Sequence, residues 1–234
     1  MNIEIQKAKD RGATKTTWLD SRHSFSFGNY YNPNRMGLGT LHVLNDDIIE
    51  PGAGFPTHPH ENMEIVTIIL EGSLEHKDSM GSHGIIHEGE VQRMSAGTGV
   101  THSEFNHSQK NPVHLLQIWV YPKQEDIKPS YEQKKFYLEK NKLHYIVSQV
   151  HNEALHINQD ASFLIATIEC SSVSYKPKSH NGVYIFVIKG EIELEKKKLE
   201  AGDAAEITDS TSIEVRSEKE SKVLMIEVPM GMSF

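Results

Sequence analysis

Two histidines stand one residue apart in the stretch Gly54-Phe-Pro-Thr-His58-Pro-His60-Glu-Asn-Met-Glu64. Successive side chains of a β-strand point to opposite faces, so His58 and His60 would project from the same face of a strand. Imidazole is the commonest metal ligand in proteins. The stretch therefore predicts a β-strand that offers two metal ligands on one side.

A second stretch repeats this spacing about 40 residues later: Gly97-Thr-Gly-Val-Thr-His102-Ser-Glu104-Phe-Asn106. His102 and Glu104 would also share one face of a strand. Placed beside the first pair in a barrel, they complete a set of three histidines and one carboxylate. Such a set suits Fe(II), Mn, Co, Ni, Cu or Zn. Four protein ligands leave an octahedral metal two open positions, which is the layout of an enzyme rather than of a structural site.

The sequence around these stretches consists of short runs rich in β-branched residues that end at turns. Strands bounded by turns every 8–12 residues are typical of a sandwich or barrel. No part of the first 120 residues has a sustained 3.6-residue apolar repeat. We therefore expect an all-β protein. The expected strands include 63–70, 113–121, 163–169, 182–189 and 223–228.

A weak internal repeat indicates two domains. Residues 63–75 resemble residues 183–193: each is an apolar strand, a charged residue, a glycine and an alternating strand. Two copies of one barrel is the economical interpretation, although glycine also punctuates unrelated hairpins. We predict an N-terminal metal-binding domain over 1–122, a polar linker over 123–135 and a C-terminal domain over 136–234. The second domain has only Lys176-Pro-Lys-Ser-His180 where the histidine pair should stand, so we expect no metal there.

Composition excludes several other classes of protein. The 234 residues contain 24 Lys and Arg against 32 Asp and Glu, and this net charge of −8 disfavours direct binding to nucleic acid or anionic membranes. Cys170 is the only cysteine, so an intramolecular disulfide or a cysteine-based metal site is impossible. The apolar runs are too short for a membrane span and the first residues do not form a signal peptide. We expect a cytoplasmic protein.

The motifs resemble a known family. The elements Pro51-Gly52, His58-x-His60 and Gly72, followed by Met94-Ser-Ala-Gly97 and His102, are similar to the two cupin motifs. The fuller strings Gly54-Phe-Pro-Thr-His-Pro-His60, His76-x-Asp78-Ser79-x-Gly81 and His102-Ser-Glu-x-Asn106 resemble the pirin family, especially bacterial pirin-like proteins with quercetin 2,3-dioxygenase activity. The resemblance implies a bicupin, with two tandem cupin domains of the jelly-roll type, the second of them degenerate.

The resemblance also implies a site. In pirins one divalent metal, usually iron, is held by residues that match His58, His60, His102 and Glu104. Fe(II) is the expected metal, with Mn, Co, Ni, Cu or Zn as alternatives. Glu64 is a rival ligand, because other cupins take their carboxylate from the first motif; otherwise we expect it to support a ligand histidine.

The activity that follows is cleavage of a flavonol such as quercetin by O2, with loss of carbon monoxide. Glu104 would be both ligand and general base. Phe25, Phe27, Phe55 and Trp119 would form an aromatic substrate wall or, alternatively, ordinary core. Histidines in the turn-rich polar segments, His76 among them, are expected to be solvated. Another possibility is a metal-dependent regulator that binds a protein partner, and a third is an inert storage-type cupin. We expect a monomer.

Overall fold

The computed structural model describes residues 1–231, and nearly all of its regular structure is β-strand. Its first barrel contains β2 (Gly12–Lys15), β3 (Leu19–His23), β4 (Leu41–Ile49), β5 (Gly54–His60), β6 (Glu64–Glu71), β7 (Ser73–Asp78), β8 (His83–His87), β9 (Glu90–Ser95), β10 (Val100–Asn106), β11 (Val113–Val120) and β12 (Ser130–Lys135). Its second barrel contains β1 (Asn2–Gln6), β13 (His144–Ser148), β14 (Ser162–Ile168), β15 (Ser171–Tyr175), β16 (Asn181–Lys189), β17 (Glu191–Leu194), β18 (Lys197–Glu200), β19 (Ala204–Thr208), β20 (Ile213–Ser217) and β21 (Ser221–Pro229). The one helical element in this range is a 3-10 turn, η1 (Ala8–Asp10).

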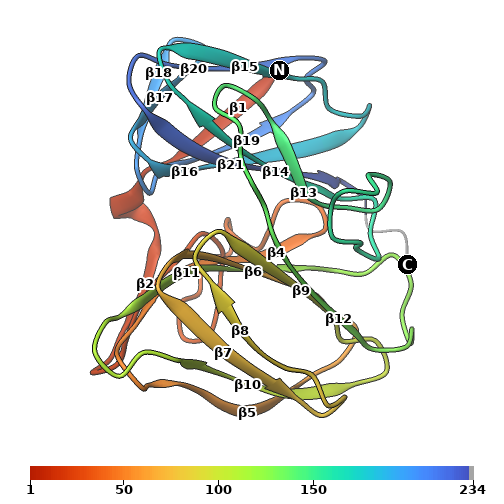
Figure 1. Cartoon of the computed structure of the whole chain (residues 1–234). Coiled ribbons are helices and arrows are strands. Elements are labelled where there is room, and N and C mark those ends of the chain that lie inside the picture. Colours follow the sequence, from red (N-terminus) through yellow and green to blue (C-terminus); the bar gives the residue numbers. More distant parts are fainter. Residues whose placement is uncertain (232–234) are drawn as a thin grey trace.

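Each barrel consists of a large and a small antiparallel sheet. In the first, seven strands in the order β12-β9-β6-β11-β4-β3-β2 face four in the order β5-β10-β7-β8. In the second, six strands in the order β1-β19-β16-β21-β14-β13 face four in the order β15-β20-β17-β18. Figure 1 shows the second barrel stacked on the first. The predicted all-β fold of two tandem barrels is confirmed.

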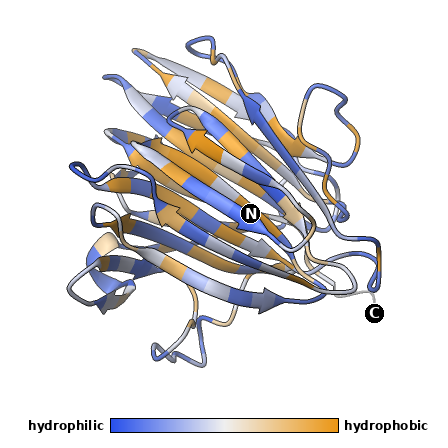
Figure 2. Ribbon diagram, turned by 60° about the horizontal axis from the view of Figure 1, so that its bottom comes forward, coloured by the Kyte–Doolittle hydropathy of each residue, from blue (hydrophilic) through white to orange (hydrophobic). Residues whose placement is uncertain are grey.

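The two large sheets pack against each other between the barrels. One apolar cluster joins Val66 and Ile118 of the first barrel to Phe163 and Phe186 of the second. The residues that alternate with these side chains point into the interior of their own barrel, as strand geometry requires. Figure 2 shows this alternation as bands of apolar and polar residues along the strands. The barrels therefore share a core.

The interiors of the two barrels differ in polarity. The inner faces of the second barrel form one continuous cluster of mostly aliphatic side chains, which includes Ile185, Val215 and Met225. The inner faces of the first barrel form two separate apolar clusters, one around Ile69 and one around Ile65. The space between these two clusters is where polar side chains can gather.

Two segments lie outside the places expected from the sequence. The expected linker 123–135 is wrong in its second part, because Ser130–Lys135 forms β12 and pairs with β9 of the first barrel. The N-terminal residues Asn2–Gln6 form β1, which pairs with β19 of the second barrel. Ile3 and Ile5 of β1 pack against the apolar interior of that barrel, which accounts for the crossing. The division at 122 and 136 otherwise stays a prediction.

The described residues also bear on the membrane. Among residues 1–231, no helix has the length and the apolar character needed to cross one.

Candidate metal centre

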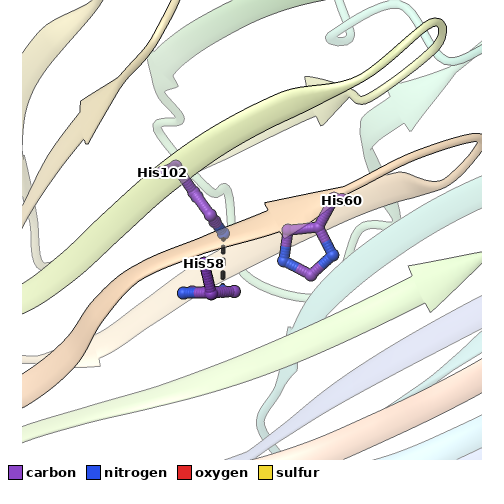
Figure 3. A group of neighbouring side chains, drawn as sticks. All are labelled: His58, His60 and His102. Carbon is purple, nitrogen blue, oxygen red and sulfur yellow. Dashed lines mark hydrogen bonds between the residues drawn. The ribbon is translucent and has the colours of Figure 1, made fainter.

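Three histidines meet inside the first barrel. His58 and His60 lie on β5, and His102 lies on the adjacent strand β10, directly opposite His58 in the register. One ring nitrogen from each lies within 4.8 Å of the others. Figure 3 shows the three rings grouped together, two from one strand and one from its neighbour. The strand parity that predicted this grouping is reproduced in the structure.

Hydrogen bonding fixes the proton of His58 on the side away from the cluster. Its Nδ1–H donates to the carbonyl oxygen of Pro56 at 2.8 Å, which leaves Nε2 with a free lone pair. That Nε2 lies 3.0 Å from Nε2 of His102. Two nitrogens bound at right angles to one metal at about 2.1 Å would be separated by roughly 3.0 Å. The two rings therefore have a spacing suited to adjacent positions around a metal ion.

The surroundings of His60 and His102 keep these two rings uncharged. Burial, together with the neighbouring His58, lowers the pKa of His60 to about 4. Burial, together with His58, His60 and His76, lowers the pKa of His102 to about 2. A histidine must be neutral to coordinate a metal. These rings are thus in the ligand form throughout the physiological pH range.

Glu104 lies next to His102 but is not grouped with His58 and His60. Its carboxylate is only 2% exposed and falls into a second group of possible ligands, with His76 and His102. Gln117 donates from Nε2 to its Oε2 at 2.8 Å. Burial raises the pKa of Glu104 to about 7, and the charge of Asp47 adds to this effect while hydrogen bonds oppose it. A cation nearby would favour the charged form, so the carboxylate fits a metal site.

Glu64, the alternative carboxylate, lies elsewhere. It is buried, accepts a hydrogen bond from Ser95 Oγ at 2.8 Å and another from the backbone N–H of Asn158 at 3.2 Å. On β6 it has the parity of Val66, whose side chain faces the second barrel. Glu64 is not a member of either group of possible ligands, and its hydrogen bonds do not reach a histidine. Neither role expected for Glu64 is found.

His76 is a residue of the site that sequence analysis missed. The expectation that it is solvated is wrong, because it is 0% exposed. Its Nε2–H donates to Asp78 at 3.1 Å, it stacks on Tyr131, and it lies directly opposite Glu104 in the β7–β10 pairing. The signal was present: His76 and Asp78 have the same one-residue spacing as His58 and His60, and thus share a face.

A cavity of about 420 Å³ opens beside the cluster. Phe27, Phe55 and Trp119 line it, and the ring of Trp119 packs edge-on against His60 with centroids 4.9 Å apart. These three residues form the expected aromatic wall. Phe25 does not join them, because it is buried in the core between the barrels against Tyr184. The cavity combines an apolar wall with a few polar groups, as small-molecule sites do.

The second barrel fills the corresponding space with apolar side chains. In the first barrel, Thr67 of β6 is paired with Gln117 of β11, and both contribute to the polar centre. In the sequence repeat, Thr67 corresponds to Ile185, which is paired with Met225. Within residues 1–231, both groups of three possible metal ligands lie in the first barrel.

Comparison with known proteins gives consistent results over both barrels. Residues 5–120 match the family model described as "Pirin", and residues 145–228 match "Quercetinase C-terminal cupin domain". The chain is 40% identical over 228 residues to the quercetin 2,3-dioxygenase of Escherichia coli, an alignment that covers 97% of this chain and 99% of the relative.

Two solved structures from the same organism are similar to this one. The crystal structure of YhhW from Escherichia coli superposes with a TM-score of 0.94 at 40% identity, over 97% of this chain and 98% of that one. The structure of bacterial pirin YhhW in complex with nickel(II) gives a TM-score of 0.93 at 39% identity, over 97% and 99% of the two chains.

Proposed function

This chain belongs to the pirin family, and we propose that its N-terminal barrel is a metal-dependent dioxygenase site that cleaves flavonols such as quercetin. The observation that carries the proposal is the combination of three clustered imidazoles and one buried carboxylate at the side of an aromatic-walled cavity. A relative of nearly the same length is named for this reaction.

His58, His60, His102 and Glu104 are the ligands that we assign to one divalent transition metal. The donor set of imidazole and carboxylate supports this choice, and so does the nickel(II) complex of a bacterial pirin. Fe(II) is our first choice, with Mn, Co, Ni, Cu or Zn as alternatives. When bound, the metal supplies Lewis acidity that favours the deprotonated flavonol and brings it next to dioxygen.

Glu104 is the base of the reaction in this proposal. A flavonol must lose the proton of its 3-hydroxyl group before its central ring can react with O2. Glu104 is a buried carboxylate that lines the cavity, so in its ionised form it is placed to accept that proton. Gln117 holds the accepting carboxylate in place through its hydrogen bond to Oε2. Glu104 therefore removes the proton, and Gln117 positions Glu104.

The aromatic wall binds the rings of the substrate. Phe27, Phe55 and Trp119 present apolar surface along the cavity, and the planar rings of a flavonol can stack on it. This contact removes water from around the reacting ring. Specificity for a planar aromatic ligand follows from the shape and polarity of these side chains.

The proposal is tested by loading the protein anaerobically with each metal, adding quercetin and then admitting oxygen. We expect flavonol absorbance to disappear with at least one of Fe, Mn, Co, Ni or Cu, and to persist in His102→Ala. His87→Ala, an exposed histidine outside the cavity, is the matched control and should behave as wild type. Persistence of flavonol absorbance with every metal would remove this substrate. Metal binding without turnover would instead favour a regulatory role.

A further inference from the structure

The cavity wall that faces His58, His60 and His102 is polar, and the proposed metal ligands do not include the polar groups on it. The histidines come from β5 and β10 of the small sheet, whereas Ser21, Asn45 and Asp47 reach the cavity from β3 and β4 of the large sheet. The aromatic wall does not need these groups. Their presence indicates that the bound molecule has polar groups on more than one side.

His23, which also lines the cavity from β3, forms a hydrogen bond with Asn45 of this polar wall. His23 donates from Nδ1 to Oδ1 of Asn45 at 2.8 Å, and Thr14 Oγ1 donates to its Nε2 at 2.8 Å. Burial lowers the pKa of His23, which is consistent with a neutral ring between an acceptor and a donor. His23 and Asn45 therefore form a fixed frame rather than a free contact.

Asp47 differs from its neighbours. It is only 3% exposed, lines the cavity, and its Oδ1 has no hydrogen-bond partner among residues 1–231. Burial raises its pKa to about 7, against the effect of a hydrogen bond from Ser21. Buried carboxylate oxygens in folded proteins almost always have a donor, and leaving one without a donor is costly. Because Asp47 lines the cavity, a molecule bound there can supply this donor.

We propose that Asp47 determines substrate specificity by accepting a hydrogen bond from a phenolic hydroxyl group, on the wall of the cavity that faces the metal ligands. This inference rests on the proposed function for the identity of the substrate class. In this role, Asp47 favours flavonols that carry a further hydroxyl group in addition to the 3-hydroxyl group. A site built to bind a hydroxyl strongly rejects the analogue that lacks it, because its own polar group is then left unpaired.

The test compares quercetin with 3-hydroxyflavone, which keeps the 3-hydroxyl and the carbonyl but has no other hydroxyl group. We expect metal-loaded wild type to prefer quercetin in kcat/KM by on the order of tenfold or more. Asp47→Ala should lose most of this preference through a higher KM for quercetin, with 3-hydroxyflavone changed by less than about twofold. Asp47→Asn keeps an acceptor oxygen and should recover part of the preference.

Controls separate this inference from the proposed function. Asp20→Asn, on the neighbouring strand and outside the cavity, should match wild type. Anaerobic calorimetry of quercetin binding to the metal-loaded proteins gives a readout that needs no turnover, and Asp47→Ala should bind quercetin about tenfold more weakly. An equal loss with both substrates, or no loss with either, would overturn the role of Asp47 and leave the proposed function intact. If quercetin binding depends on Asp47 but no turnover occurs, the proposed function fails and the role of Asp47 in binding stands.

Discussion

Glu104 depends on a chain of side chains that reaches across the interior of the first barrel. Gln117 donates to Glu104, and Thr67 donates from Oγ1 to Oε1 of Gln117 at 3.1 Å. Thr67, Gln117 and Glu104 are all buried. The Gln117 amide can donate to Glu104 and accept from Thr67 at the same time, because it carries both a donor and an acceptor. The orientation of the Gln117 amide is therefore fixed by Thr67, and that of the Glu104 carboxylate by Gln117.

Replacing Gln117 by Leu should weaken metal binding on the order of 10–100-fold, because a ligand carboxylate would lose the group that holds it. The affinity is measured by competition with a chromophoric chelator at pH 7, together with the metal content of the purified protein. Gln109→Leu, an exposed position, is the matched control. Unchanged affinity in Gln117→Leu would mean that Glu104 is not a ligand or does not need Gln117.

At the scale of strands, an ion pair connects β11 to β4. His114 donates from Nε2 to Asp46 at 2.6 Å, and Arg11 lies 3.2 Å from the other carboxylate oxygen of Asp46. Burial alone would lower the pKa of His114, but the hydrogen bond and charge of Asp46 together outweigh it and raise that pKa. At Asp46, the hydrogen bonds and charges of His114 and Arg11 outweigh burial and lower the pKa of its carboxyl group.

These two directions give a stability window. The contribution of His114 to the free energy of unfolding is complete below its unfolded pKa of about 6.5, and it is lost as pH rises through its folded pKa. The contribution of Asp46 is complete above its unfolded pKa of about 3.9, and it is lost as pH falls through its folded pKa. His114→Gln should therefore lower the free energy of unfolding by on the order of 1 kcal/mol at pH 6, and by less at pH 9. Urea unfolding at the two pH values measures this. His156→Gln, an exposed position, is the control, and an equal effect at both pH values would contradict the assignment.

Strand periodicity explains which parts of the structure the sequence could predict. The side-chain alternation of β5 is local, so residue spacing alone places His58 and His60 on one face. His102 joins them through the pairing of β10 with β5, which the resemblance to a barrel fold suggested. His76 obeys the same rule, but the turn residues around it suggested a solvated segment. The pairing of β1 with β19 joins residues about 200 positions apart, and no local pattern specifies it. Likewise, the prolines and charges before β12 are typical of a linker, although its last six residues form a strand.

The whole molecule is organised around the core that its two large sheets share. Side chains of both barrels belong to one apolar cluster, and Phe163 of the second barrel is fully buried in it. The cluster of His58, His60 and His102 lies on the other side of the first large sheet. Loss of the shared core should therefore affect both barrels together, because neither can bury the outer face of its large sheet alone.

Phe163→Ala should lower the free energy of unfolding by about 3–5 kcal/mol, since it removes a fully buried aromatic ring. Unfolding followed by circular dichroism and by tryptophan fluorescence should remain one coincident transition. Tyr137→Ala is the control, because that ring is 84% exposed and should change stability by less than about 0.5 kcal/mol. Separate transitions would show that the barrels fold independently.

We propose above that the first barrel binds a metal and cleaves a flavonol with dioxygen. The most direct measurement is the amount of carbon monoxide released for each quercetin consumed by the metal-loaded protein in the presence of oxygen. We expect one carbon monoxide for each quercetin consumed by the wild type, and no release by His102→Ala. Quercetin loss without carbon monoxide, or equal release by His102→Ala, would contradict it.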